Sequence, residues 1–159
     1  MKVYLAADHA GFELKEKIAT YLKENNYEVE DLGAYTLNKD DDYPDFAFAA
    51  AKKVVESEGK SKAILLCGSA EGMCIAANKV KGARAIAAWT PINAQLSREH
   101  NDANVLCLSG GKTISPIPGL SLEEAEKIID VWLATTFSAE ERHARRLKKI
   151  GEIEDLWQK

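Results

Sequence analysis

The stretch LLCGSAEGMCIAANK, residues 65–79, begins as an apolar run, passes through Cys67 into a turn bounded by Gly68 and Gly72, and continues as a predicted helix. A buried strand that leads through a glycine-containing turn into a helix is typical of α/β proteins. Such turns lie outside the carboxyl ends of parallel strands, where these folds bind ligands. The stretch therefore predicts an α/β fold with a candidate site at Cys67.

The same alternation of segments extends along most of the chain. The predicted strands are residues 2–7, 27–32, 63–67, 83–89 and 104–108, and the predicted helices are residues 11–25, 44–57, 72–79, 91–100, 122–136 and 138–158. Several strands are continuous apolar runs, as expected where helices cover both faces of a sheet. We predict a three-layer, doubly wound (Rossmann-like) α/β sheet of five parallel strands with an extra C-terminal helix.

Length and composition indicate one domain over residues 1–159, because 46% hydrophobic residues can supply a sizeable core. The formal charge of -4 argues against nucleic acid or a membrane surface as a partner. The first apolar run is too short for a signal peptide, and no segment reaches membrane-spanning length. Three cysteines without an export signal favour reduced thiols and a cytoplasmic protein, and the spacing of Cys67 and Cys74 matches no common zinc pattern, so no metal is predicted.

The turn after Cys67 can direct successive backbone N–H groups into one concavity, to which the following helix adds its positive N-terminal end. This environment favours an anion or a developing oxyanion and predicts a lowered pKa for the Cys67 thiol. The residues of this candidate site are Gly68, Ser69, Ala70, Glu71 and Gly72. A small buried cysteine with no chemical role is an equally common alternative at such a position.

Polar residues in three other stretches are also candidates. Asp8 and His9 follow the first predicted strand and therefore face the same edge of the sheet as Cys67, although both could serve only as turn or cap residues. His100 ends a predicted helix and could be an acid or base, or simply a favourable cation at a helix C-terminus. Arg142 and Arg146 are four residues apart on one helical face, which suits either a phosphate or a solvated basic surface.

Together these stretches resemble the ribose-5-phosphate isomerase B and galactose-6-phosphate isomerase family over nearly the whole chain. The resemblance is carried by AADHAGF (6–12), DYPDFA (42–47), CGSAEGMCIAANKVKGARA (67–85), SREHNDANVL (97–106) and RHARR (142–146). It implies an enzyme that interconverts aldose and ketose phosphates without a metal or cofactor. It also implies active sites built at a homodimer interface, with the helix over residues 138–158 at that interface and a tetramer as the alternative assembly.

The resemblance also implies individual roles. Cys67 would be the base that moves a proton between the two carbons of an enediolate, and His100 would be the acid that assists opening of the sugar ring. The turn would stabilise the oxyanion, which such a base requires nearby. Six further residues would contact the substrate: Asp8, His9, Tyr43, Asn101, Arg142 and Arg146. Of these, His9 and the two arginines would bind the phosphate, with the arginines contributed by the partner subunit.

The chain departs from the family pattern at two places. Ala70 and Glu71 occupy a turn that usually has glycine after the serine or threonine, so the turn must avoid a positive φ or carry strain. Gly111, followed by Lys112, stands where the family tends to have a phosphate-binding arginine. The simplest predicted reaction is ribose 5-phosphate to ribulose 5-phosphate. The alternatives are a four- or six-carbon sugar phosphate, a catalytically silent sugar-phosphate-binding module, and an oligomerising scaffold.

Overall fold

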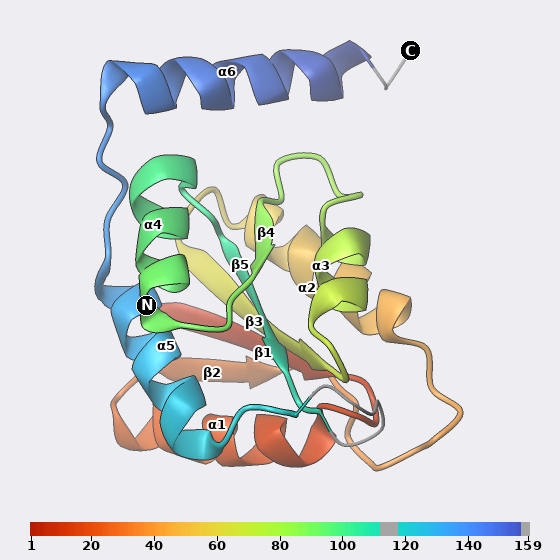
Figure 1. Ribbon diagram of the computed structural model, residues 1–159. Helices are drawn as coiled ribbons and strands as arrows, with labels where there is room; N and C mark the ends of the chain where they lie inside the picture. Colours follow the sequence, from red (N-terminus) through yellow and green to blue (C-terminus); the bar gives the residue numbers. More distant parts are fainter. Residues whose placement is uncertain (112–117, 157–159) are drawn as a thin grey trace.

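A computed structural model describes residues 1–111 and 118–156 (Figure 1). Within these residues the strands are β1 (Lys2–Ala7), β2 (Glu28–Asp31), β3 (Ser61–Cys67), β4 (Ala85–Ala87) and β5 (Val105–Ser109). The helices are α1 (Phe12–Glu24), α2 (Tyr43–Glu56), α3 (Glu71–Ala77), α4 (Pro91–Asn101), α5 (Leu122–Ala134) and α6 (Glu141–Leu156). All strand pairs are parallel, in the order β2-β1-β3-β5-β4, so the predicted doubly wound sheet of five strands is confirmed.

Strand β4 and helix α6 begin later than the sequence predicts. Strand β4 covers Ala85–Ala87 instead of 83–89. It begins late because the Ala83 N–H donates within a turn to the Val80 carbonyl and the Arg84 N–H donates to the Asn104 side chain. Helix α6 starts at Glu141 instead of residue 138, because Ala139 has a φ of 54° and a left-handed residue cannot continue a right-handed helix.

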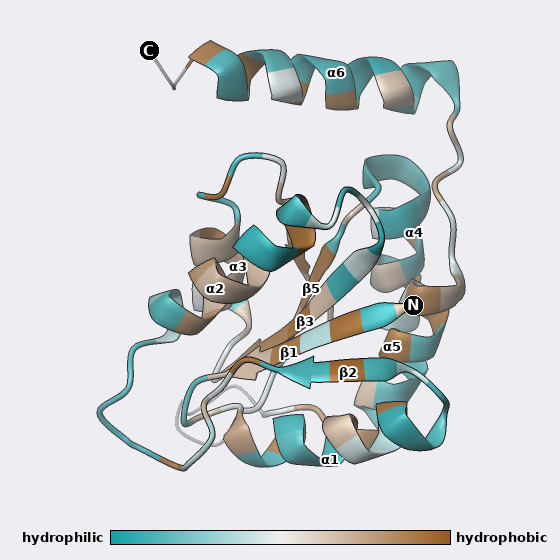
Figure 2. Cartoon of the chain, turned by 180° about the vertical axis from the view of Figure 1, so that it is seen from behind, coloured by the Kyte–Doolittle hydropathy of each residue, from teal (hydrophilic) through white to brown (hydrophobic). Residues whose placement is uncertain are grey.

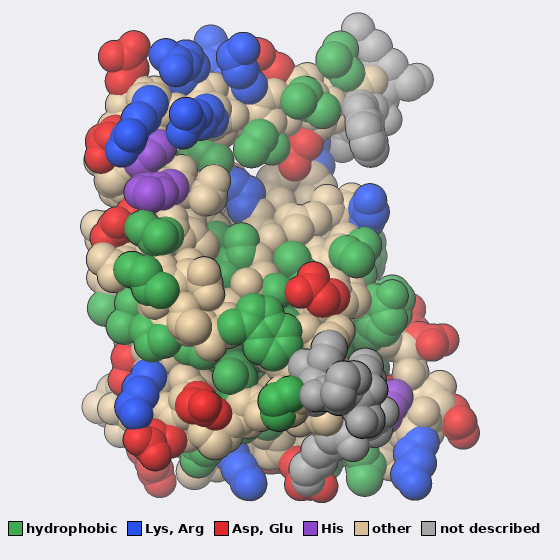
Figure 3. Space-filling view, in the orientation of Figure 1, with side chains coloured by type: hydrophobic (Ala, Val, Ile, Leu, Met, Phe, Trp, Pro, Cys, Tyr) green, Lys and Arg blue, Asp and Glu red, His purple; other side chains and the backbone are tan. Residues whose placement is uncertain are grey.

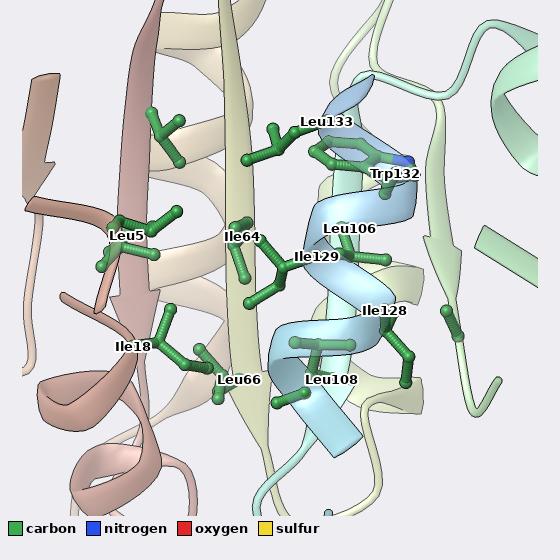
Figure 4. Close-up of a cluster of buried hydrophobic side chains, with 14 of the residues drawn as sticks. Leu5, Ile18, Ile64, Leu66, Leu106, Leu108, Ile128, Ile129, Trp132 and Leu133 are labelled. Atoms are coloured by element: carbon green, nitrogen blue, oxygen red, sulfur yellow. The ribbon is translucent and has the colours of Figure 1, made fainter. Parts of the chain in front are cut away.

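Helices cover both faces of the sheet. On one face, α1, α4 and α5 bury a cluster that includes Leu5, Ile64, Leu106 and Trp132 (Figure 4). On the other face, α2 and α3 pack mainly through alanines and Met73, and these small side chains let the helices approach the sheet closely. The apolar sides of the helices turn inward toward the strands (Figure 2). Alternate residues of each strand point to opposite faces of the sheet. Because helices cover both faces, both sets of residues are apolar and the strands are continuous apolar runs in the sequence.

The parallel strands give the sheet two distinct edges. At the carboxyl edge, the turns after β1, β3 and β5 pack closely: a Cβ added to Gly11 would lie 2.5 Å from the Leu66 Cβ, and one added to Gly110 would lie 2.3 Å from the Ala10 oxygen. At the amino edge, α6 lies across the molecule and stands apart from the two helix layers (Figure 1). No helix in the described part of the chain is both long and apolar enough to cross a membrane.

Candidate active site

Cys67 ends β3 at the carboxyl edge, beside the turns that follow β1 and β5. The register pairs Cys67 with Ser109 and places Asp8 next to the end of β3, where the Asp8 N–H donates to the Leu66 carbonyl at 3.2 Å. Cys67 is buried, with 4% of the residue exposed. We call the residues at this edge, namely Asp8, His9, Tyr43, Cys67 and residues 68–72, the carboxyl-edge group.

The pKa of the Cys67 thiol is shifted in the direction opposite to the sequence prediction. Burial raises the pKa of Cys67, and the Asp8 carboxylate raises it further. The backbone of Met73, Ser69 and Ala70 interacts with the sulfur and acts in the opposite direction, as predicted for the turn. The prediction of a lowered pKa is nevertheless wrong, because removal of the thiolate from water outweighs the stabilisation by the backbone.

The turn after Cys67 is strained at Ala70, which is one of the two outcomes expected from the sequence. Ala70 precedes α3 with φ 68° and ψ -28°, and it is fully buried. A left-handed conformation costs an alanine roughly 1–2 kcal/mol, which glycine does not pay. Glu71, in the first turn of α3, is exposed.

We expect Ala70→Gly to stabilise the protein by up to about 1 kcal/mol, because relief of the positive φ exceeds the added entropy of the unfolded chain. Denaturant unfolding measures the change. Ala76→Gly, within α3, is the matched control and should destabilise by about 1 kcal/mol. Equal destabilisation by both substitutions would contradict a strained Ala70.

Asp8 combines a structural role with an available oxygen. Its Oδ1 accepts hydrogen bonds from the Ala10 N–H at 2.9 Å and the Gly11 N–H at 3.2 Å, which holds the turn into α1. Its Oδ2 accepts no hydrogen bond from the described residues. Burial raises the pKa of Asp8 despite these two donors. A buried carboxylate with one oxygen unused is suited to accept a hydrogen bond from a hydroxyl group.

His9 is held by Asp41, a residue that the sequence analysis missed. The Asp41 Oδ1 lies 3.0 Å from the His9 backbone nitrogen and 2.7 Å from His9 Nδ1. The Asp41 side chain is only 8% exposed, and its Oδ2 is buried without a hydrogen-bond partner among the described residues. Because one oxygen accepts from both the backbone and the ring, the orientation of the imidazole is fixed, with Nε2 left for another partner.

Tyr43 lies over the start of α3. A Cβ added to Gly72 would come within 2.9 Å of the Tyr43 ring, so glycine is needed for this contact. Tyr43 is the first residue of α2, so the start of this helix and its DYPDFA motif lie at the turn. Tyr43 therefore lies against the turn after Cys67, and its contact with the substrate stays a prediction.

The other predicted site residues lie at the opposite edge of the sheet. We call His100, Asn101, Arg142 and Arg146 the amino-edge group. His100 and Asn101 end α4 just before β5 begins, whereas Cys67 pairs with the last residue of β5. The five residues of β5 span about 17 Å, so one copy of the chain does not bring these residues to Cys67.

The amino-edge group is organised around a pair of histidines. The rings of His100 and His143 have centroids 4.3 Å apart, and His143 Nδ1 lies 2.9 Å from the Ser138 Oγ. Burial and then the nearby His100 lower the pKa of His143. Arg142 Nε donates to Glu140 at 2.8 Å, so the solvated ion pair considered from sequence is present for this arginine. Figure 3 shows the histidine pair beside a cluster of basic side chains on α6.

Two remaining predictions concern ions and the loop after β5. In the parts of the chain described, no group of three or more His, Cys, Asp or Glu side chains is placed to hold a metal ion. Gly111, with φ 66°, donates its N–H to the Gly68 carbonyl at 3.0 Å and so lies against the Cys67 turn. Lys112 lies outside the described residues.

The chain is similar to known proteins over nearly its whole length. A family model described as Ribose/Galactose Isomerase matches residues 3–150. Ribose-5-phosphate isomerase B of Mycobacterium tuberculosis (strain ATCC 25618 / H37Rv) is 44% identical over 97% of this chain and 90% of its own length. The structure of ribose-5-phosphate isomerase B from Clostridium thermocellum has a TM-score of 0.89 and 42% identity, covering 99% of each chain. A structure of the Mycoplasma genitalium protein with bound ribulose 5-phosphate has a TM-score of 0.89 and 41% identity over 97% of this chain and 96% of that one.

Proposed function

The chain belongs to the ribose/galactose isomerase family, and we propose that it interconverts ribose 5-phosphate and ribulose 5-phosphate. Relatives more than 40% identical are named ribose-5-phosphate isomerase B, and one of them is seen with ribulose 5-phosphate bound. The observation that carries the chemical proposal is the position of the Cys67 thiol at the carboxyl edge, beside Asp8 and the backbone of the turn. The three free cysteines favour a cytoplasmic enzyme.

The reaction needs one group that can both accept and return a proton. The Cys67 thiolate removes the proton from C2 of the open-chain aldose, and the electron pair moves into an enediolate. The same thiol returns the proton to C1, and transfer of the hydroxyl proton from O2 to O1 completes the ketose. The backbone N–H groups of the turn stabilise the enediolate oxygen, and Oδ2 of Asp8 accepts a hydrogen bond from a sugar hydroxyl.

Two copies of the chain are needed to complete this site. Cys67 and the turn are at one edge of the sheet, and His100 and the arginines are at the other, so a homodimer supplies one group from each subunit. Isoleucines and a leucine are exposed on the helices next to these groups: Ile75 on α3, Ile92 and Leu96 on α4, and Ile150 and Ile153 on α6. A second copy of the chain is the occupant that would bury them.

The amino-edge group contributes acid and phosphate-binding chemistry in this dimer. His100 protonates the ring oxygen as the furanose opens, and Asn101 contacts the sugar. Arg142 and Arg146 bind the phosphate together with His9 of the other subunit, because guanidinium groups match phosphate oxygens in pairs. This division of roles explains why a strongly basic helix surface occurs on an acidic protein.

A panel of four-, five- and six-carbon aldose phosphates, followed for ketose formation, tests the function. We expect turnover to be fastest with ribose 5-phosphate. Faster turnover of another sugar phosphate would reassign the substrate. Binding of ribose 5-phosphate without turnover of any sugar would instead indicate a silent binding module, and absence of both would indicate a scaffold.

Asp41→Ala should raise KM for ribose 5-phosphate about tenfold with little change in kcat, since it frees the imidazole that contacts the phosphate. Asp41→Asn keeps an acceptor for the His9 backbone and should recover part of the loss. Asp40→Ala, at the exposed neighbouring carboxylate, is the control. An unchanged KM in Asp41→Ala would show that His9 does not depend on this contact.

A further inference from the structure

A cavity of about 260 Å³ lies at the amino edge of the sheet, away from Cys67. Its walls come from the start of β3, the residues just before β4 and β5, the end of α4, and the inner side of α2. The charged residues that line it are Lys62, Arg84, Arg98 and Asp102. Three basic side chains thus meet one acidic side chain, and none of the four has a role in the isomerase site proposed above.

Both oxygens of the single carboxylate accept hydrogen bonds from the two arginines. Asp102 Oδ1 accepts from Arg98 Nη1 at 2.7 Å, and its Oδ2 accepts from Arg84 Nη2 at 2.8 Å. Its single negative charge does not balance the three positive charges that line the cavity. The cavity keeps an excess of two basic groups over acidic ones, which disfavours a cation and favours a dianion.

Each of the three basic side chains has one nitrogen that donates a weak hydrogen bond, or none, to the described residues. Lys62 Nζ lies 3.4 Å from the Met1 sulfur, a weak acceptor, and has no other hydrogen-bond partner there. Arg84 Nη1 reaches only the Gly82 carbonyl, at 3.5 Å. Arg98 Nη2 donates no hydrogen bond to the described residues, although this side chain is only 9% exposed.

The Trp132 ring is within cation–π distance of two of these basic groups. Lys62 Nζ lies over the ring at 6.0 Å from its centroid, and the Cζ of Arg98 lies over it at 5.9 Å. Burial, followed by the charge of Arg98, lowers the pKa of Lys62. Two like charges kept near one another in a partly buried wall are disfavoured unless an anion joins them.

We propose that this cavity binds a phosphate group, either as free inorganic phosphate or as part of a small phosphate ester. Two guanidinium groups and one ammonium group provide the planar and point-charge donors that phosphate oxygens accept from. The apolar side chains of Val54 and Val55 on the adjoining wall suit the carbon atoms of an ester. Arg84 Nε also donates to the Asn101 carbonyl at 3.0 Å, which joins this wall of the cavity to the end of α4.

Calorimetric titration of the full chain with inorganic phosphate tests the proposal. The double variant Arg142→Ala/Arg146→Ala removes the arginines assigned to the catalytic phosphate, and we expect it to keep one phosphate site. Adding Lys62→Met should weaken that site at least about tenfold, because a charged hydrogen bond is lost. Lys60→Met, an exposed lysine just before β3, is the charge-matched control and should leave it unchanged.

Absence of phosphate binding in the double variant, or equal effects of Lys62→Met and Lys60→Met, would overturn the proposal. A parallel titration with glycerol 3-phosphate separates the two sources of the phosphate group, since tighter binding of the ester identifies an esterified ligand. Turnover of ribose 5-phosphate by Lys62→Met alone should equal that of the unmodified protein. A negative phosphate titration would therefore leave the isomerase assignment intact, and a negative turnover assay would leave the phosphate proposal intact.

Discussion

Cys67→Ala should lower the rate of proton exchange at C2 of ribose 5-phosphate by about 10³-fold, because the group that removes the proton is lost. The measurement is exchange of the C2 hydrogen with deuterated solvent, followed by NMR, together with ketose formation. Ribose 5-phosphate should still bind, since the phosphate and hydroxyl contacts come from other residues. Undiminished exchange would eliminate Cys67 as the base.

The control for this variant is Cys107→Ala. Cys107 is a buried cysteine on the adjacent strand β5, so its removal leaves a void of similar size without touching the carboxyl edge. Exchange should be retained in this control even if both variants lose comparable stability. Loss of activity in both variants would point to packing instead of proton transfer.

The rate should also depend on pH in a defined direction. Burial raises the pKa of the Cys67 thiol, so the thiol form predominates at neutral pH and only the minor thiolate form is a base. Below that pKa the thiolate fraction rises about tenfold per pH unit, and kcat/KM should rise with it. A pH profile that is flat above neutrality would indicate that a partner subunit has already ionised the thiol.

The sequence predicts the fold well because local patterns determine it. Continuous apolar strands and intervening amphipathic helices specify a parallel sheet with two covered faces, and residues 2–7 form β1 as predicted. The errors fall at the ends of elements, as at Arg84, whose N–H donates to the Asn104 side chain before β4 begins, and at Ala139, whose positive φ delays α6.

The site is predictable only in part, because its electrostatics and its long-range contacts have no local pattern. Ala70 in the turn signals that strain is possible, but only the backbone geometry establishes it. The Asp41 contact joins His9 to a residue 32 positions away, and no periodicity indicates it. The thiol pKa depends on the balance between burial and backbone donors, and that balance requires coordinates.

Mixed dimers should recover activity that neither variant has alone. When Cys67→Ala is co-expressed with Arg142→Ala/Arg146→Ala, each heterodimer has one site with an intact carboxyl-edge group from one subunit and an intact amino-edge group from the other. Half of the dimers in a random mixture are heterodimers and half of their sites are complete, so we expect about a quarter of the unmodified activity. Different affinity tags on the two variants allow the heterodimer to be isolated and assayed.

The matched control is co-expression of Cys67→Ala with Asp8→Ala, two substitutions in the same carboxyl-edge group. Every site in that heterodimer lacks one residue of the group, so no activity should return. Recovery in both mixtures would mean that subunits reassemble or revert, and recovery in neither would place the whole site within one chain. The second result would require a rearrangement across the full length of β5, because His100 and Cys67 lie at its opposite ends.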